Sequence, residues 1–165
     1  MIPHLDNLIE ALRDELKQYG EMLALLDQQQ EFVLSHAVDE VLSTVSAVNQ
    51  QSGAVQAARR HREQCQQALA AAFQQPRPAA FAEIIPLLPE DYRPLVQALV
   101  DENNELLLRI QRRVRQNHLL LSRCLDLMQR FMNSLFPGLR PTLYTGTGSL
   151  LSANLPPTAR YEAVG

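Results

Sequence analysis

Histidines, cysteines and a glycine-rich stretch are the parts of this sequence that could carry out chemistry. The chain has four histidines and two cysteines, which are His4, His36, His61, His118, Cys65 and Cys124. They do not form a set with the ligand spacing of a zinc site, and the cysteines do not form a CxxC pair. The sequence therefore predicts no metal, no cofactor and no disulfide.

Two further motifs have only a superficial likeness to functional elements. The segment TGTGS, residues 145–149, lacks the lysine of a phosphate-binding loop and follows no strand pattern. A phosphoacceptor role for His118 is an alternative, but HLLLSRC contains neither the lysine nor the glycine that usually follow such a histidine. We therefore predict that the protein is not an enzyme.

Four arginines lie between two leucine triplets in the stretch LLLRIQRRVRQNHLLL. On a helix with about 100° per residue, Arg109, Arg112 and Arg115 point away from the apolar stripe. Arg113 lies at the edge of that stripe, and Glu105 precedes Arg109 at a spacing that favours an ion pair. The prediction is a solvated, ion-paired face; an acidic protein partner and a nucleic acid are alternatives. The net charge of −3 and the lack of adjacent aromatic residues disfavour nucleic acid.

Apolar periodicity and prolines predict the elements that position these residues. The first helix, residues 3–33, has a heptad-like seam at Leu5, Ile9, Leu12, Leu16, Tyr19, Leu23 and Leu26. The second, residues 38–74, begins with a stripe at Val38, Val41, Leu42, Val45 and Val48. The third covers residues 90–136. The prolines between them predict a linker at 75–89, with room for one short turn around 79–85.

The expected fold is all-α, with three long antiparallel helices in a coiled-coil-like bundle, a proline-rich linker and a flexible C-terminal tail. The 165 residues, 46% of them apolar, suffice for one domain with a real core. We expect the helical domain to cover residues 1–136. Residues 137–165, which are rich in proline, glycine, serine and threonine, form the expected tail.

The third helix has one continuous apolar stripe centred on Ile110. Its members are Tyr92, Val96, Leu99, Asn103, Leu106, Val114, Asn117, Leu121, Met128, Met132 and Leu135. Asn103 and Asn117 lie on this stripe, where a polar side chain costs stability but fixes register and needs a buried hydrogen-bond partner.

Further leucines on the third helix lie outside this stripe. Leu108 and Leu119 point opposite to it, while Leu120, Leu127 and Phe131 point to one side. Residues 119–136 are therefore apolar around more than half of the helix. Such a surface is covered either by the chain's own linker or tail, or by a partner, and the partner is the favoured prediction.

Three features together resemble the FlgN family of flagellar type III export chaperones. The first is the order of parts, two long helices followed by a proline-broken linker and a third long helix. The second is VDENNELLLRIQRRVRQNHLLLSRCLDLMQRFMNSLF, with Asn117, Leu120 and then Leu127-Met128. The third is YTGTG, which begins with Tyr144. The residues after Gly148 depart from this pattern, and no role is assigned to them.

This resemblance implies a cytoplasmic, non-enzymatic chaperone. Its partners would be unassembled hook-associated proteins as cargo and the flagellar export apparatus, to which it delivers them. Together with the apolar surplus of the third helix, it predicts five cargo contacts, Leu119, Leu120, Leu127, Phe131 and Leu135. Contact of Tyr144 with the export gate is implied by the resemblance alone.

The start of the chain, MIPHLDNLIE, has acidic residues where a signal peptide has basic ones, and no apolar stretch reaches the length of a membrane span. We therefore expect a cytoplasmic protein with no membrane insertion and no nucleic-acid partner. A structural coiled-coil homo-oligomer, or a helical adaptor without chaperone activity, is the alternative function. A homo-oligomer that also binds cargo stays open.

Overall fold

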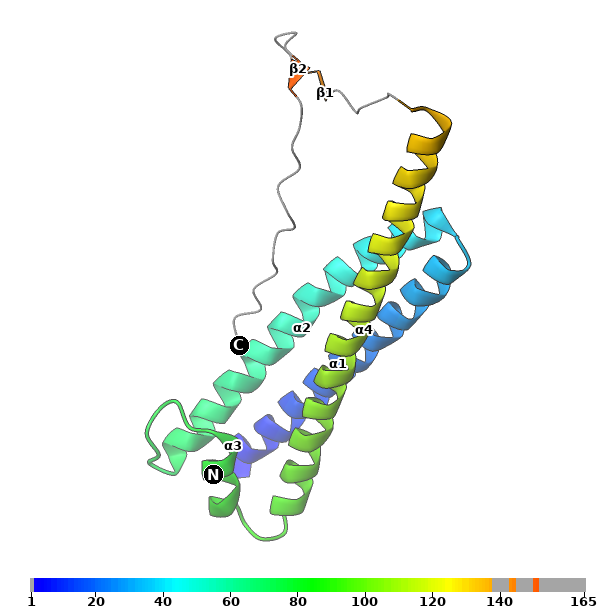
Figure 1. Ribbon diagram of the computed structural model, residues 1–165. Coiled ribbons are helices and arrows are strands. Elements are labelled where there is room, and N and C mark those ends of the chain that lie inside the picture. Colours follow the sequence, from blue (N-terminus) through cyan, green and yellow to red (C-terminus); the bar gives the residue numbers. More distant parts are fainter. Residues whose placement is uncertain (1, 138–142, 145–149, 152–165) are drawn as a thin grey trace. The chain divides into compact units, whose positions relative to one another are not determined.

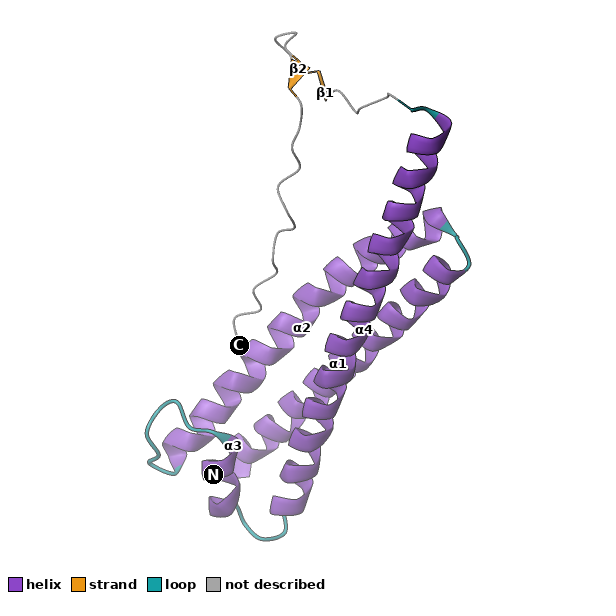
Figure 2. Cartoon of the chain, viewed as in Figure 1, coloured by secondary structure: helices purple, strands orange, loops and turns teal. Residues whose placement is uncertain are grey.

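The computed structural model describes residues 2–137, 143–144 and 150–151 (Figure 1). Its elements are, in chain order, α1 (Ile2–Leu34), α2 (Val38–Ala72), α3 (Phe81–Ile84), the 3-10 helix η1 (Ile85–Leu87), α4 (Arg93–Leu135), β1 (Leu143–Tyr144) and β2 (Leu150–Leu151). Helices dominate the described residues (Figure 2). The chain divides into two units, residues 1–123 and 124–165, and α4 contributes to both.

The three long helices lie where the apolar periodicity predicts them. The predicted all-α class is confirmed for residues 2–135, where every regular element is a helix. The linker is more ordered than a simple connector, because it contains the predicted short turn as α3 and continues into η1. The described residues therefore form four α-helices rather than three. Both linker helices stay short because Pro86 lacks an N–H and is tolerated only in the first turn of η1.

The direction of α4 agrees with the expected antiparallel order of the three long helices. Asn103 Nδ2 donates to the carbonyl oxygen of Leu12 at 3.1 Å, and Asn117 Nδ2 donates to that of Leu26 at 2.8 Å. Each pair is 91 residues apart, a whole number of heptads, so α4 runs parallel to α1 in the same heptad phase. Only successive long helices are antiparallel, as Figure 1 shows.

The core of the first unit consists of two apolar clusters. One joins α1, the end of α2, the linker and the start of α4 through Leu5, Leu8, Ile9, Leu12, Leu69, Ala70, Ala79, Ile84, Leu88, Val96 and Leu99. The other contains Tyr19, Met22, Leu23, Leu26 and Ile110, with Val48, Val55, Leu106 and Leu107 packed against it. Each fully buried leucine contributes about 1.5–3 kcal/mol, so the two clusters hold the three long helices together.

A buried ionic network crosses the first unit beside these clusters. The carboxylate of Glu15 accepts hydrogen bonds from the guanidinium of Arg62 at 2.9 Å and from the hydroxyl of Tyr19 at 3.0 Å. Burial and the adjacent carboxylate of Glu15 raise the pKa of Tyr19 to about 12. Arg62 also donates to Gln66, whose amide donates to the carbonyl of Ala79 at 2.7 Å. The network therefore connects α1 and α2 with the linker.

The first half of α2 presents a different face to α1 from the one predicted. Val41 and Val48 are half-buried and Thr44 is buried, whereas Val38, Leu42 and Val45 are exposed. The seam of α2 follows heptad positions that include polar residues, such as Thr44 and further on Gln51, whose amide donates to the backbone of α1. The predicted stripe is therefore wrong, because it was built from apolar residues alone.

The second unit contains the end of α4 and two short strands. Leu143 pairs with Leu151 and Tyr144 with Leu150 in an antiparallel register. This pairing was not predicted. The rest of the predicted tail, including residues 145–149 with the TGTGS motif, lies outside the described residues.

Candidate partner-binding site

The end of α4 carries a dense group of exposed apolar side chains, which we call the terminal segment (residues 124–136). Seven large apolar residues in it are each 50–66% exposed, namely Leu125, Leu127, Met128, Phe131, Met132, Leu135 and Phe136. The helix is intact to its end, since the N–H of Phe136 still donates to the carbonyl of Met132 at 2.9 Å. Exposure of this many large apolar groups on one stretch of helix is typical of interaction surfaces.

Helical periodicity sorts these side chains into two rows. The leucine row consists of Leu127, Phe131 and Leu135, and the methionine row consists of Leu125, Met128, Met132 and Phe136. Both rows follow steps of three or four residues, as one face of a helix does. Together they cover about 180° of the helix circumference. The remaining face carries Asp126, Gln129, Arg130 and Asn133.

The structure separates the five predicted cargo contacts. Leu127, Phe131 and Leu135 are exposed and form the leucine row of the second unit. Leu119 and Leu120 belong to the first unit; Leu119 is 57% exposed, but Leu120 is half-buried and offers less surface than predicted. Tyr144, the predicted export-gate residue, lies in β1.

The methionine row was missed by sequence reasoning. Met128 and Met132 were assigned to the buried stripe of the third helix, yet both are more than half exposed. Helix α4 has 43 residues and α1 has 33. A comparison of the two predicted helix lengths would have shown that the stripe of the third helix extends further than the seam of the first.

The upstream part of the predicted stripe is largely confirmed. Val96, Leu99 and Ile110 are buried, as are Asn103 and Asn117, whereas Val114 is 46% exposed. Asn103 donates to the carbonyls of Leu12 and Leu99, and Asn117 to Leu26 and the side chain of Gln29. The Oδ1 atom of each asparagine is buried without a hydrogen-bond partner among the described residues. Their buried positions and their need for partners were thus predicted correctly.

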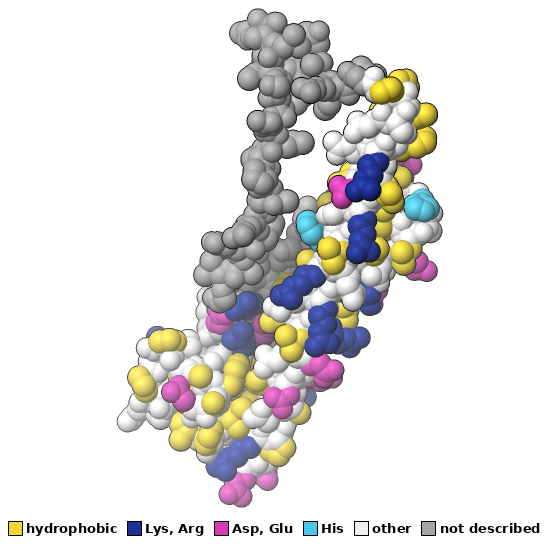
Figure 3. All heavy atoms as spheres, in the orientation of Figure 1, with side chains coloured by type: hydrophobic (Ala, Val, Ile, Leu, Met, Phe, Trp, Pro, Cys, Tyr) yellow, Lys and Arg dark blue, Asp and Glu magenta, His cyan; other side chains and the backbone are white. Residues whose placement is uncertain are grey.

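The arginines of α4 are solvated but less paired than predicted. Arg113 is half-buried and binds Asp27 of α1 at 2.6 Å, together with the side chain of Gln30. Arg109, Arg112 and Arg115 are exposed. Within residues 2–137 no ion pair joins Glu105 to Arg109, although both residues are exposed and lie at the i,i+4 spacing. Figure 3 shows basic side chains following the exposed surface of α4. These basic side chains lie along the helix and do not gather around a pocket.

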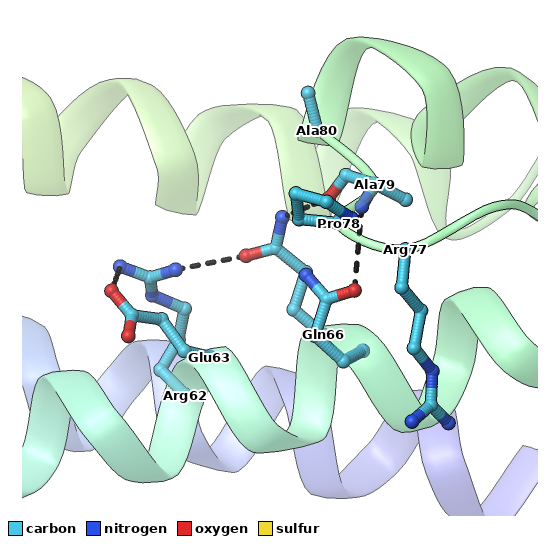
Figure 4. A pocket seen from close by; sticks show the side chains of 8 residues that line it. Arg62, Glu63, Gln66, Arg77, Pro78, Ala79 and Ala80 are labelled. Atoms are coloured by element: carbon cyan, nitrogen blue, oxygen red, sulfur yellow. Dashed lines mark hydrogen bonds and ion pairs between the residues drawn. The ribbon is translucent and has the colours of Figure 1, made fainter.

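One hollow in the first unit does not have the features of a catalytic site. It has a volume of about 680 Å³ and lies between α2 and the linker, where Gln66 bonds to Ala79 and Arg62 lies beside Glu63 (Figure 4). It is open to solvent, and its polar lining includes Arg62, Glu63 and Gln66, which are hydrogen-bonded or ion-paired. The imidazole of His61 lies 3.7 Å from the Cys65 sulfur, an i,i+4 pair that sequence reasoning passed over. No third histidine, cysteine or carboxylate joins them into a metal-binding group in the described chain.

Comparison with known families decides which protein class this geometry belongs to. A family model described as "FlgN protein" matches residues 1–152. The chain belongs to the FlgN family. The FlgN match includes α1 to α4 and Tyr144, so the whole terminal segment lies inside the family region, and residues 153–165 lie outside it. Searches of curated proteins and of solved structures give no match.

Membership of the FlgN family identifies the chain as a flagellar export chaperone in the general sense. None of the helices in the described part of the chain combines the length and the hydrophobicity needed to span a lipid bilayer.

Proposed function

We propose that this protein binds unassembled hook-associated proteins in the cytoplasm, prevents their premature assembly and delivers them to the type III export apparatus. The observation that supports this most directly is the terminal segment of α4, which exposes seven large apolar side chains in a member of a chaperone family. No enzymatic step is part of this proposal.

The physical basis is the exposure of apolar surface that a cargo helix covers. Apolar anchors at i, i+3, i+4 and i+7 on a partner helix fit such a row of side chains. Burial of apolar surface contributes about 25 cal/mol per Å², offset by the cost of ordering the cargo segment. This offset keeps binding reversible, which export of the cargo requires.

The proposed cargo contacts are Leu119, Leu127, Phe131 and Leu135, with a smaller contribution from the half-buried Leu120. They are supported by their exposure and by helical spacing. We propose Tyr144 as a contact to the export gate, on the basis of family membership and its position within the family match.

Copurification with each hook-associated protein, followed by titration calorimetry, tests the proposal. Leu127→Asp combined with Phe131→Asp should lower cargo affinity at least about 100-fold, because two apolar anchors become charged groups that must lose their hydration on binding. Gln129→Asp combined with Asn133→Asp adds the same two charges to the polar face and should change affinity less than about threefold. Unchanged cargo binding in the first variant, with helicity intact by circular dichroism, would refute the assignment of the site.

A structural homo-oligomer is the second candidate, because α1 and α4 already pair in a parallel heptad register and the terminal segment continues the apolar pattern. Sedimentation velocity distinguishes the two functions. A stable oligomer that binds no hook-associated protein, and that dissociates in the Leu127→Asp and Phe131→Asp variant, would favour the structural function.

A further inference from the structure

The width of the apolar surface on the terminal segment exceeds what one partner helix covers. The apolar stripe by which a surface helix faces a core is about 100° wide or more, and the seam toward a single partner helix is narrower. The leucine row and the methionine row together occupy about 180°. Side chains of both rows are at least half exposed, so neither row is already covered.

In the first unit, one apolar cluster joins α4 with two other helices. Leu106 and Leu107 are neighbours on α4 that point about 100° apart, yet both pack against the second core cluster. That cluster contains residues of α1, such as Leu23, and Val48 and Val55 of α2 pack against it. Residues of two antiparallel helices therefore share one apolar cluster with α4.

The apolar rows lie in the part of α4 that belongs to the second unit. Helix α4 has 43 residues, whereas α1, which runs parallel to α4 in the first unit, has 33. The heptad-spaced rows continue to Phe136 and are exposed throughout.

We propose that one cargo molecule covers the terminal segment with two amphipathic helical segments, one along the leucine row and one along the methionine row. This inference rests on the proposed function and specifies the form of the cargo that the site accepts. A cargo with a helical hairpin, or with two terminal helices that come together, has the required form, and its two helices would share an apolar surface with α4 as residues of α1 and α2 do in the second core cluster.

The charges beside the rows assign a chemical character to these segments. Arg130 borders the leucine row, and it has no ion pair among residues 2–137. The segment on the leucine row therefore carries an acidic residue at its edge.

The test uses the full chain, full-length hook-associated proteins and three matched double variants. Leu127→Ser with Phe131→Ser removes anchors from the leucine row, and Met128→Ser with Met132→Ser removes anchors from the methionine row. Gln129→Ser with Asn133→Ser is the control on the polar face. All three place two serines in one helix turn, so their effects on helix propensity are comparable.

If one cargo molecule binds with two segments, each row variant should lower the affinity for cargo at least tenfold. The control variant should change this affinity less than twofold, and one cargo should bind per chaperone. A synthetic peptide of one terminal cargo helix binds more weakly than the whole cargo and responds to only one of the two row variants. Circular dichroism checks that each variant keeps its helicity.

Three results would overturn the inference. A methionine-row variant that binds whole cargo as tightly as the wild type shows that one segment covers the leucine row alone, and the converse result excludes a segment on the leucine row. Two cargo molecules bound per chaperone exclude a single cargo that supplies both segments. If the wild-type chain binds none of the hook-associated proteins, the proposed function itself fails, and the inference fails with it.

Discussion

Two parts of the same helix use apolar residues in opposite ways. In residues 93–123 of α4, valine, leucine and isoleucine share the buried face with two asparagines, and arginines occupy much of the outer face. In the terminal segment, large apolar residues are more abundant, yet they are exposed. Apolar content therefore does not decide burial along α4; the presence of a covering helix does.

The difference separates two roles for side chains on one helix. Upstream, the polar groups Asn103, Asn117 and Arg113 each bond to α1, so they specify where α4 lies against it. Downstream, the large apolar groups of the terminal segment are at least half exposed and are available for another molecule. Substitutions upstream should thus affect folding, and substitutions downstream should affect binding.

The largest expected effect on folding comes from the buried ionic network. Arg62→Ala removes the cation from the buried carboxylate of Glu15 and should lower the free energy of unfolding by about 3–5 kcal/mol. Arg59→Ala removes the exposed pair with Glu63 and should cost less than about 1 kcal/mol. Urea denaturation measures both. Equal losses would show that the buried pair has no special part in the first unit.

Alkaline pH should weaken the same region. The folded-state pKa of Tyr19 is about 12, against 10.0 for the unfolded residue, so above pH 10 the unfolded chain loses a proton that the folded chain keeps. The free energy of unfolding should therefore fall by roughly 1–3 kcal/mol as pH rises from 10 to 12. Tyr19→Phe should remove this component, and Tyr92→Phe, at a half-buried tyrosine of the first cluster, is the control. A Tyr19→Phe variant with an unaltered pH profile would contradict the prediction.

Replacing the asparagines tests whether register or stability is their main contribution. Asn103→Leu and Asn117→Leu each remove a buried Oδ1 that has no partner, and each should raise the free energy of unfolding by about 1 kcal/mol. The double variant should give doubled amide signals in NMR spectra, because α4 then adopts more than one register. A large loss of stability with single NMR signals would show instead that the bonds to Leu12 and Leu26 mainly stabilise the bundle.

The smallest effect is expected at the edge of the leucine row. Arg130→Glu should weaken cargo binding about two- to fivefold at low salt, because an exposed ion pair contributes about 1 kcal/mol or less. The difference should shrink at 1 M salt, where charges are screened, while Arg130→Lys should bind as the wild type does. Tighter cargo binding by Arg130→Glu would mean that the edge of the cargo segment is basic.

Sequence patterns predicted the features of the fold that depend on local physics. The period of Leu5 to Leu26 indicated α1, the prolines after residue 75 ended α2, and the positions of Asn103 and Asn117 on the wheel indicated their burial. These signals are local because propensity, proline geometry and helical period act within a few turns.

Features that depend on distant parts of the chain could not be predicted in the same way. The wheel placed Met128 and Met132 on the correct face, but the face is buried only as far as a neighbouring helix extends. The pair of Glu15 and Arg62 joins residues 47 apart, with no local pattern to indicate it. The cargo contacts remain predictions, since only a complex tests them.

The spacing of the two asparagines has a consequence for misfolding. Asn103 and Asn117 lie two heptads apart and bond to carbonyls that are also two heptads apart. A sliding error of two heptads, about 21 Å along α1, would set Asn103 opposite Leu26 and still allow its Nδ2 to donate to a carbonyl of α1. The asparagines alone therefore do not exclude this misaligned register. The linker does so, because Ile84 and Leu88 are fully buried in the first cluster and tether the beginning of α4. The packing of the proline-rich linker thus fixes how far along α1 the helix α4 is placed.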